Sequence, residues 1–367
     1  MTSTGRRLGL GLVIVAAMQV SASAATQPAV VAKPARHAAA PAVVKAVPAP
    51  RYLSDRIDQL GSGFDGLVGI AVRSIDDGWE TGWKDQALYP QQSVSKLWVS
   101  ITALDAVDRG RASLDDKVTL TTSDLTLFHE PIITDILKDG SYTTTLGDLM
   151  LRAITTSDNT ANDKLMRSVG GPNAVRAMIA RKHLGSIRFA NGERDMQSRI
   201  AGLTWKQDYA LNGGFSKARD ALPIQVRSAA FNRYIADPYD GAAPSAIVNA
   251  LARLKRGELL SAASTARLLD IMSRTHTGPN RLKGGLQPGW TLSHKTGTGQ
   301  ELGGVQAGYN DIGILTAPDG KSYAVAVMIK KTSTPLPVRM TLMNNVVAAV
   351  IAQHDQASGT SSSARRR

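Results

Sequence analysis

Residues 93–110 read SVSKLWVSITALDAVDRG, and the hydrophobic pattern of the chain changes where this stretch begins. Before it, Leu67–Val72 is a short apolar run typical of a buried strand, and Asp76-Asp77-Gly78 predicts a turn into a hairpin partner over residues 79–84. Within it, apolar residues recur at the spacing of one helix face and stop at Gly110. The residues on that face are Val94, Leu97, Trp98, Ile101, Leu104 and Val107.

The rest of the body shows the same two periods. Helical patterns cover residues 146–169, 172–182, 244–255, 261–273 and 337–353, and strand runs cover residues 289–294, 311–315 and 323–329. Strands from both ends therefore flank a helical middle. We predict an α/β (α+β) fold in which residues 51–90 and 287–356 form an antiparallel sheet flanked by helices. Residues 91–286 are expected to form an inserted, all-helical subdomain.

The two ends of the chain differ from this body. Arg6 and Arg7 precede a short apolar run over residues 8–18, and Ala22-Ser23-Ala24 has the form of a cleavage site, so residues 1–24 are predicted to be a signal peptide. The Ala- and Pro-rich residues 25–50 are predicted to be a linker, and residues 357–367 a disordered basic tail. The folded domain, residues 51–356, is then expected in the periplasm or outside the cell, as a monomer without a stable membrane span.

Charge and composition limit the partners. The net charge is +13, but residues 1–51 contribute six of these charges and Arg365, Arg366 and Arg367 contribute three, so only +4 belongs to the rest. This distribution argues against nucleic acid as a partner. Hydrophobic residues make up 43% of the chain, enough for a sizeable core. The chain has no cysteine, and its six histidines show no metal-binding spacing, so no cofactor is expected.

Ser93 and Lys96 open the helix described above and share one of its faces. A serine hydroxyl needs a nearby base to become a nucleophile. A lysine held away from water among other positive groups can serve as that base, and the helix N-terminus favours negative charge. Alone, the pair favours a helix-capping serine and a solvated lysine.

Two further short motifs carry chemistry of the same kind. Ser157-Asp158-Asn159 lies between helical segments, where a hydroxyl can relay a proton and an amide can hold a substrate amide. Lys295-Thr296-Gly297 follows the strand run over residues 289–294. There the lysine and the threonine can bind a carboxylate, and the glycine permits a close approach to the backbone.

Together, in this order, the three motifs resemble the signature of the penicillin-recognising serine enzymes, and the likeness to class A serine β-lactamases extends over residues 51–354. RLKGGLQPGWTLSHKTGTG, residues 281–299, is similar to the class A segment that enters the K-T-G strand. DNTAND, residues 158–163, resembles the branch with Asp at the end of this run. The resemblance implies a β-lactamase/DD-peptidase-like fold.

Class A enzymes carry a deacylating glutamate in a pattern E-x-x-L-N, and this chain has Glu193-Arg194-Asp195-Met196-Gln197. Glu193 lies 22 residues after Gly171 and five after Arg188, which also resembles a family arginine. The chain departs from the family in three ways. Gln197 replaces asparagine, Asn191 stands where many members have an arginine that pins this loop by an ion pair, and about thirty extra residues follow Gln197 before Asp240–Pro244.

The resemblance also suggests roles for residues outside the motifs. Arg281 is similar to the second carboxylate-binding cation of members that lack an arginine on the strand after K-T-G. His129 stands where the family has an aromatic gate. His294 needs no catalytic role, and Asp163 is expected to be structural.

The implied reaction opens a β-lactam ring, an activity that confers antibiotic resistance. The substrate carboxylate docks on Lys295, Thr296 and Arg281, with Gly297 beside it. Ser93 attacks the lactam carbonyl, whose oxygen is held by the backbone N–H groups of Ser93 and Thr298. Lys96, or Glu193 through a water, takes the serine proton. Ser157 protonates the departing nitrogen, Glu193 activates the water that releases the product, and Asn159 and Gln197 orient substrate and water.

Two alternatives remain open on the sequence. A penicillin-binding peptidase or cell-wall serine hydrolase of the same fold, acting on a peptidoglycan peptide, would acylate and then stall with β-lactams. A non-catalytic penicillin sensor or wall-binding module would keep the pocket without turnover. Whether Glu193 points at Ser93 distinguishes a β-lactamase from the first alternative, and a hydrolysis assay on a chromogenic cephalosporin separates all three.

Overall fold

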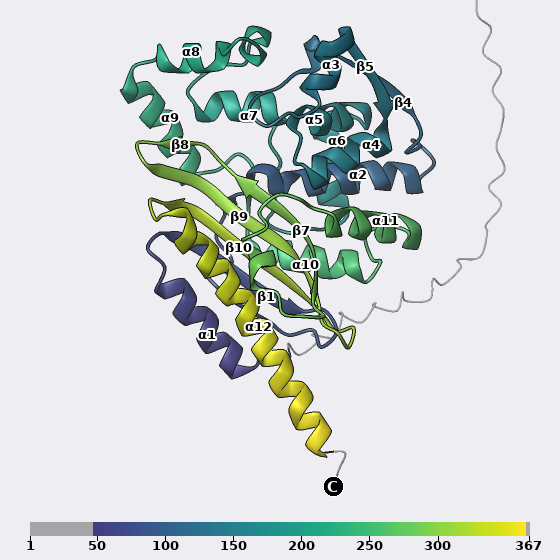
Figure 1. Ribbon diagram of the computed structural model, residues 1–367, viewed down its shortest axis with the longest axis vertical. Coiled ribbons are helices and arrows are strands. Elements are labelled where there is room, and N and C mark those ends of the chain that lie inside the picture. Colours follow the sequence, from purple (N-terminus) through teal and green to yellow (C-terminus); the bar gives the residue numbers. More distant parts are fainter. Residues whose placement is uncertain (1–46, 365–367) are drawn as a thin grey trace, which may run out of the picture. The chain divides into compact units, whose positions relative to one another are not determined.

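The computed structural model describes residues 47–364 (Figure 1). The predicted signal peptide and most of the predicted linker therefore lie outside the described residues. The folded body begins with helix α1 (Arg51–Ser62), at the residue where the change in composition predicts it. Within the described part of the chain, no helix combines the length and the apolar character that a membrane crossing needs.

A single antiparallel sheet forms the centre of the fold, and both ends of the body supply its strands. Its order is β2–β1–β10–β9–β7, and β8 pairs with the end of β9. This arrangement confirms the predicted fold class. The strands are β1 (Leu67–Ser74), β2 (Glu80–Trp83), β7 (Thr291–Thr298), β8 (Glu301–Leu302), β9 (Val305–Thr316) and β10 (Ser322–Thr332).

Alternate residues of the central strands face two separate cores. Val325, Val327 and Ile329 of β10 pack with residues of α1 and of α12 (Leu336–Ala364), which lie side by side over one face of the sheet (Figure 1). Ala324 and Ala326 face the helical part instead. Since successive side chains of a strand point to opposite faces, and both faces of this sheet are covered, these strands have an apolar residue at nearly every position.

The inserted part is built around α2 (Lys96–Asp108), in which every residue from Lys96 to Asp105 is buried. The other helices here are α3 (Ile133–Asp139), α4 (Leu146–Thr155), α5 (Asn159–Ser168), α6 (Gly171–Arg181), α7 (Glu193–Ile200), α8 (Gly214–Asp220), α9 (Ile224–Ala236), α10 (Pro244–Lys255) and α11 (Ala262–Ser273). Short 3₁₀ turns are η1 (Gln92–Ser95), η2 (Thr122–Asp124), η3 (Gln207–Ala210) and η4 (Leu282–Gly285).

The insert departs from the all-helical prediction. β4 (Lys117–Thr121) pairs with β5 (Ser141–Thr145), and β3 (Tyr89–Pro90) pairs with β6 (Gly241–Ala242). The β4–β5 ribbon is rich in threonine, whose branched Cβ favours extended backbone.

Three predicted boundaries also differ from the structure. The helical pattern over residues 146–169 is two helices, because the chain turns at Ser157. The K-T-G motif lies inside β7 and does not follow the strand. Helix α12 continues to Ala364, past the predicted start of the disordered tail at Ala357, since no proline interrupts its hydrogen-bonding ladder.

Candidate active site

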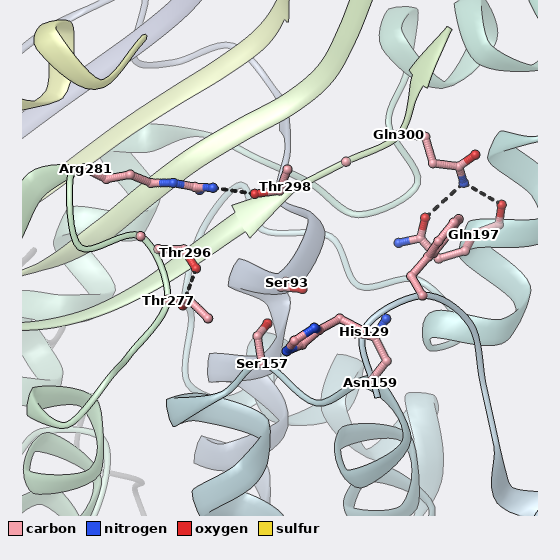
Figure 2. Close-up of a pocket in the computed structure, with 13 residues that line it drawn as sticks. Ser93, His129, Ser157, Asn159, Gln197, Thr277, Arg281, Thr296, Thr298 and Gln300 are labelled. Carbon is pink, nitrogen blue, oxygen red and sulfur yellow. Dashed lines mark hydrogen bonds between the residues drawn. The ribbon is translucent and has the colours of Figure 1, made fainter. Parts of the chain in front are cut away.

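A cavity of about 470 Å³ lies where α2, the α4–α5 turn and strand β7 meet. This is the size range of small-molecule sites. Thr277, Gly278, Arg281, Thr296 and Thr298 line one end, and Phe128, His129, Asn159, Gln197 and Gln300 line the other. Ser93 and Ser157 lie between the two groups (Figure 2). The cavity thus has a cationic end and an end lined by amides and aromatic rings.

Ser93 lies in the 3₁₀ turn η1, which runs directly into α2. One helical turn later, Lys96 donates from Nζ to Ser93 Oγ at 2.7 Å. Strand β9 fixes the turn from outside, because Asn310 donates to the carbonyl oxygens of Pro90 and Gln91. The predicted nucleophile and its lysine are therefore in direct contact and are held by the sheet.

Lys96 is fully buried and connects three parts of the chain. Besides Ser93, its Nζ donates to Asn159 Oδ1 at 2.8 Å and to Glu193 Oε1 at 2.5 Å. A buried ammonium must be paired and hydrogen-bonded to be tolerated. The ion pair with Glu193 and the two neutral acceptors satisfy all three of its donors.

Glu193 is the first residue of α7 and is only 2% exposed. Its second oxygen, Oε2, accepts from Gln197 Nε2 at 3.1 Å. Asp163, from α5, accepts from the backbone N–H of Glu193 at 3.0 Å, which confirms that Asp163 has a structural contact here. Burial, followed by the charge of Glu193, raises the pKa of Asp163 to about 6. The glutamate therefore points toward Ser93 and away from solvent, and Lys96 links the two.

The Ser157-Asp158-Asn159 motif forms the tight turn between α4 and α5. Ser157 has φ +61°, a conformation uncommon outside glycine, which breaks the helical pattern. Asp158 holds the turn by accepting from the backbone of Ala161 at 2.8 Å and of Ile132 at 2.7 Å. This geometry presents the Ser157 hydroxyl to Lys295, whose Nζ donates to it at 2.9 Å.

Strand β7 carries the K-T-G motif on the edge of the sheet. Lys295 is completely buried, and burial, with a further contribution from the charge of Lys96, lowers its pKa well below the usual value. Thr296 Oγ1 lies 2.6 Å from Thr277 Oγ1 at the cavity wall. A Cβ at Gly297 would overlap the carbonyl oxygen of Gln91, so only glycine lets the strand approach the Ser93 turn.

Arg281 closes the cationic end of the cavity. Its guanidinium donates to the Thr298 hydroxyl at 2.5 Å and to the backbone carbonyl of Asn310 at 2.7 Å. The same group lies 3.9 Å from the ring centroid of Tyr309, a cation–π distance. These contacts hold the guanidinium beside Thr298 at the cavity wall.

Other residues singled out from the sequence take supporting or separate places. His129 lines the cavity, and its carbonyl accepts from the backbone of Asn159. His294 is buried and lies 2.9 Å from Asp311 through Nδ1. Arg188 forms an exposed ion pair with Asp237.

Sequence reasoning missed four residues of this site. Gln92, next to Ser93, accepts from Gln197 Nε2 at 3.0 Å. Gln300 donates to Gln197 Oε1 at 3.0 Å (Figure 2), and Thr277 and Phe128 line the cavity. Adjacency to a motif was the available signal for the two glutamines. Thr277 and Phe128 carry no local signal, because the fold alone brings them to the cavity.

Comparison with known proteins gives a consistent result over nearly the whole body. The profile of the Beta-lactamase enzyme family matches residues 52–354. A β-lactamase of Bacteroides uniformis is 29% identical over 281 residues, 76% of this chain and 82% of that protein. The extended-spectrum β-lactamase PER-1 of Pseudomonas aeruginosa is 26% identical over 301 residues, 82% of this chain and 85% of that protein.

Solved structures agree with these sequence matches. The β-lactamase from Chitinophaga pinensis DSM 2588 superposes with a TM-score of 0.66 at 26% identity, covering 81% of this chain and 97% of that one. The TLA-1 extended-spectrum β-lactamase superposes with a TM-score of 0.67 at 28% identity, covering 81% and 96%.

The contact between Asp163 and the Glu193 segment predicts a pH-dependent stability. Because the pKa of Asp163 is raised in the folded state, the folded chain binds a proton there that the unfolded chain releases. That stabilisation is complete below the ordinary carboxyl pKa and is lost as the pH rises through about 6. Asp163→Asn removes this titration, so the variant should gain about 1–3 kcal/mol in free energy of unfolding relative to wild type between pH 4 and pH 7.

Urea denaturation of both proteins across this pH range measures the difference. Asp195→Asn, at a partly exposed position of the same helix, is the control, and its difference in free energy of unfolding from wild type should not change in this way with pH. If the difference in free energy of unfolding between Asp163→Asn and wild type stays constant with pH, the raised pKa of Asp163 is contradicted.

Proposed function

This chain belongs to the β-lactamase enzyme family and, within it, to the class A serine β-lactamases, and on that premise we propose that it hydrolyses penicillins and cephalosporins through an ester on Ser93. The observation that carries the proposal is the row of contacts from Ser93 through Lys96 to Glu193, at 2.7 Å and 2.5 Å. A nucleophile at the cavity wall is thereby connected through a buried lysine to a buried carboxylate base.

The two ends of the cavity orient the substrate. The carboxylate of the β-lactam docks at the cationic end, against Lys295, Thr296 and Thr298, with Arg281 behind them. This places the lactam carbonyl over Ser93, where the backbone N–H groups of Ser93 and Thr298 form the oxyanion hole, worth about 3–4 kcal/mol per donor in a well-studied protease. The acyl side chain then extends toward the end lined by Asn159 and Gln197.

Acylation follows the contacts of Lys96. Its ammonium gives a proton to Glu193 Oε1, and the resulting amine accepts the proton of Ser93 as the Oγ–C bond forms. The net result is the transfer of one proton from Ser93 to Glu193. Lys96 and Glu193, the two candidate bases for acylation, therefore act in the same proton path. Ser157, which accepts from Lys295 at 2.9 Å, gives its proton to the departing nitrogen and is reprotonated by Lys295.

Deacylation uses the same glutamate. Before this step Glu193 releases the proton that it gained, and Lys295 takes up one in place of the proton that it gave to Ser157, so the proton count is restored. The Glu193 carboxylate then removes a proton from the water that attacks the ester carbonyl, and this proton passes through Lys96 to Ser93 Oγ as the ester C–O bond breaks. Gln197, which donates to Glu193 Oε2, holds the carboxylate in place for this step. The buried position of Glu193 supports turnover over the stalled adduct of a penicillin-binding peptidase or a sensor.

Export is part of the proposal. The positive residues Arg6 and Arg7, the apolar run over residues 8–18 and the Ala22-Ser23-Ala24 site support a mature enzyme in the periplasm or outside the cell.

Ser93→Ala should abolish both turnover and covalent labelling by penicillin, because Ser93 is the cavity hydroxyl that contacts Lys96, whereas the Ser157 hydroxyl accepts from Lys295 and is assigned to protonate the departing nitrogen. Intact-protein mass spectrometry after incubation with benzylpenicillin is the measurement. Ser100→Ala, in α2 and outside the residues that line the cavity, should still be labelled. An adduct that survives on Ser93→Ala would place the nucleophile elsewhere.

Glu193→Ala should still acylate to some degree, more slowly because Lys96 loses the acceptor of its proton, but should accumulate a long-lived adduct. An ester hydrolyses slowly without a positioned base, and general-base catalysis contributes about 10²–10⁴-fold. Quench-flow with mass detection separates formation of the adduct from its decay. Asp195→Ala, two residues along α7, should decay at the wild-type rate, and equal decay in Glu193→Ala would remove Glu193 from the role of base.

Arg281→Ala should weaken substrate capture while the fold survives. Loss of a charge-assisted contact to the substrate carboxylate costs about 1.5–3 kcal/mol, or about tenfold to a hundredfold in kcat/KM. Steady-state kinetics and a melting curve test this, with Arg274→Ala as the exposed-arginine control. An unchanged kcat/KM would make Arg281 a bystander.

A further inference from the structure

The segment between Gln197 and Asp240, which is longer than the family pattern, returns to the active site through one side chain. It contains η3, α8 and α9, and α9 carries Tyr234. Tyr234 is completely buried, and its hydroxyl reaches Gln92, the residue directly before Ser93. We propose that Tyr234 is a positioning residue for Glu193, acting through Asp240, Gln92 and Gln197; the inference rests on the proposed function of Glu193.

Three buried groups form a closed ring of hydrogen bonds. Tyr234 donates from its hydroxyl to Asp240 Oδ1 at 3.0 Å. Asp240 Oδ2 accepts from the backbone N–H of Gln92 at 2.6 Å, and Gln92 Nε2 donates to the Tyr234 hydroxyl oxygen at 2.5 Å. All three residues are fully buried, so each bond is shielded from water.

The carboxylate of Asp240 sets the direction of every bond in this ring. Burial raises its pKa to about 6, so at pH 7.5 it is mostly ionised and can only accept. Tyr234 must therefore give its proton to Asp240, which leaves the hydroxyl oxygen to accept from Gln92 Nε2. The side-chain oxygen of Gln92 is thereby turned away from Tyr234.

That oxygen continues the chain to the proposed base. Gln92 Oε1 accepts from Gln197 Nε2 at 3.0 Å, and the same nitrogen donates to Glu193 Oε2 at 3.1 Å. Gln300 donates to Gln197 Oε1 and occupies the other side of the amide. The orientation of the Gln197 amide, and with it the donor presented to Glu193, thus follows from the proton that Tyr234 gives to Asp240.

Two further features surround this network. Gln92 has φ +53°, a conformation that a non-glycine residue keeps only when its surroundings enforce it. Asn191, where many family members have an arginine, contacts Asp195 and Arg176 instead. The contacts of Asp240 are with neutral donors, and Tyr234 supplies one of the two that its carboxylate uses.

Tyr234→Phe tests the inference, because it removes the hydroxyl and keeps the ring. At pH 7.5 we expect the rate of deacylation to fall about tenfold to a hundredfold, the scale of a misplaced catalytic group, while the rate of acylation changes less than threefold. The adduct should therefore accumulate with benzylpenicillin. Tyr239→Phe is the matched control, since its ring lies 5.6 Å from that of Tyr234 and its hydroxyl is not a member of the ring of bonds.

Gln92→Asn breaks the same relay at its next link with a residue that tolerates positive φ. It should show the same split between the two rates, and the double variant should be no slower than the slower single variant, because both remove one path. If the losses in deacylation rate of the two single variants multiply in the double variant, the relay is overturned. Wild-type deacylation in Tyr234→Phe, or an equal loss of both rates with a lowered melting temperature, would overturn the positioning role. Wild type that itself retains the adduct would overturn the proposed function as well.

Discussion

The fold of this enzyme depends on how it accommodates one buried ammonium group. Lys96 Nζ is bonded to oxygens of Ser93, Asn159 and Glu193, which come from η1, α5 and α7. Losing one partner of such a buried pair costs about 3–5 kcal/mol, because the remaining charge stays buried and unpaired. The three elements therefore have to meet at α2. The same requirement that stabilises the helical part brings the nucleophile, the amide and the carboxylate together.

The sheet provides the second half of the site. Strand β7 lies at its edge, and Asn310 of the neighbouring strand β9 holds the Ser93 turn against it. Lys295 and Arg281 then place two cations beside the cavity, one bonded to Ser157 and one to Thr298. The proposed substrate carries a carboxylate, which would compensate these cations at the end of the cavity where burial leaves them poorly solvated. The cations thus lie at one end of the cavity, and Ser93 and Ser157 lie at its centre.

Most of the fold and the three motifs could be predicted from the sequence, since the periods of strands and helices and the spacing of the motifs are local properties. The S-D-N motif could be placed between helical segments, but the positive φ of Ser157 could not be predicted, because it depends on the hydrogen bonds of Asp158 to a distant backbone. The C-terminal limit of β7 was also predicted too early. Lys295 and Thr296 are buried in the strand although they are polar, so the apolar pattern ends before the strand does. The Tyr234–Gln92 contact joins residues 142 positions apart and leaves no pattern in either segment.

The central claim is that Glu193 is the base that hydrolyses the Ser93 ester, so that each enzyme molecule turns over repeatedly. The amount of product formed per enzyme tests this claim most directly. Wild-type protein is mixed with a chromogenic cephalosporin in large excess, and the ring-opened product is followed by absorbance. The account predicts a constant rate that continues through many equivalents of product per enzyme. A burst of about one equivalent of product per enzyme, after which product formation stops, would contradict it.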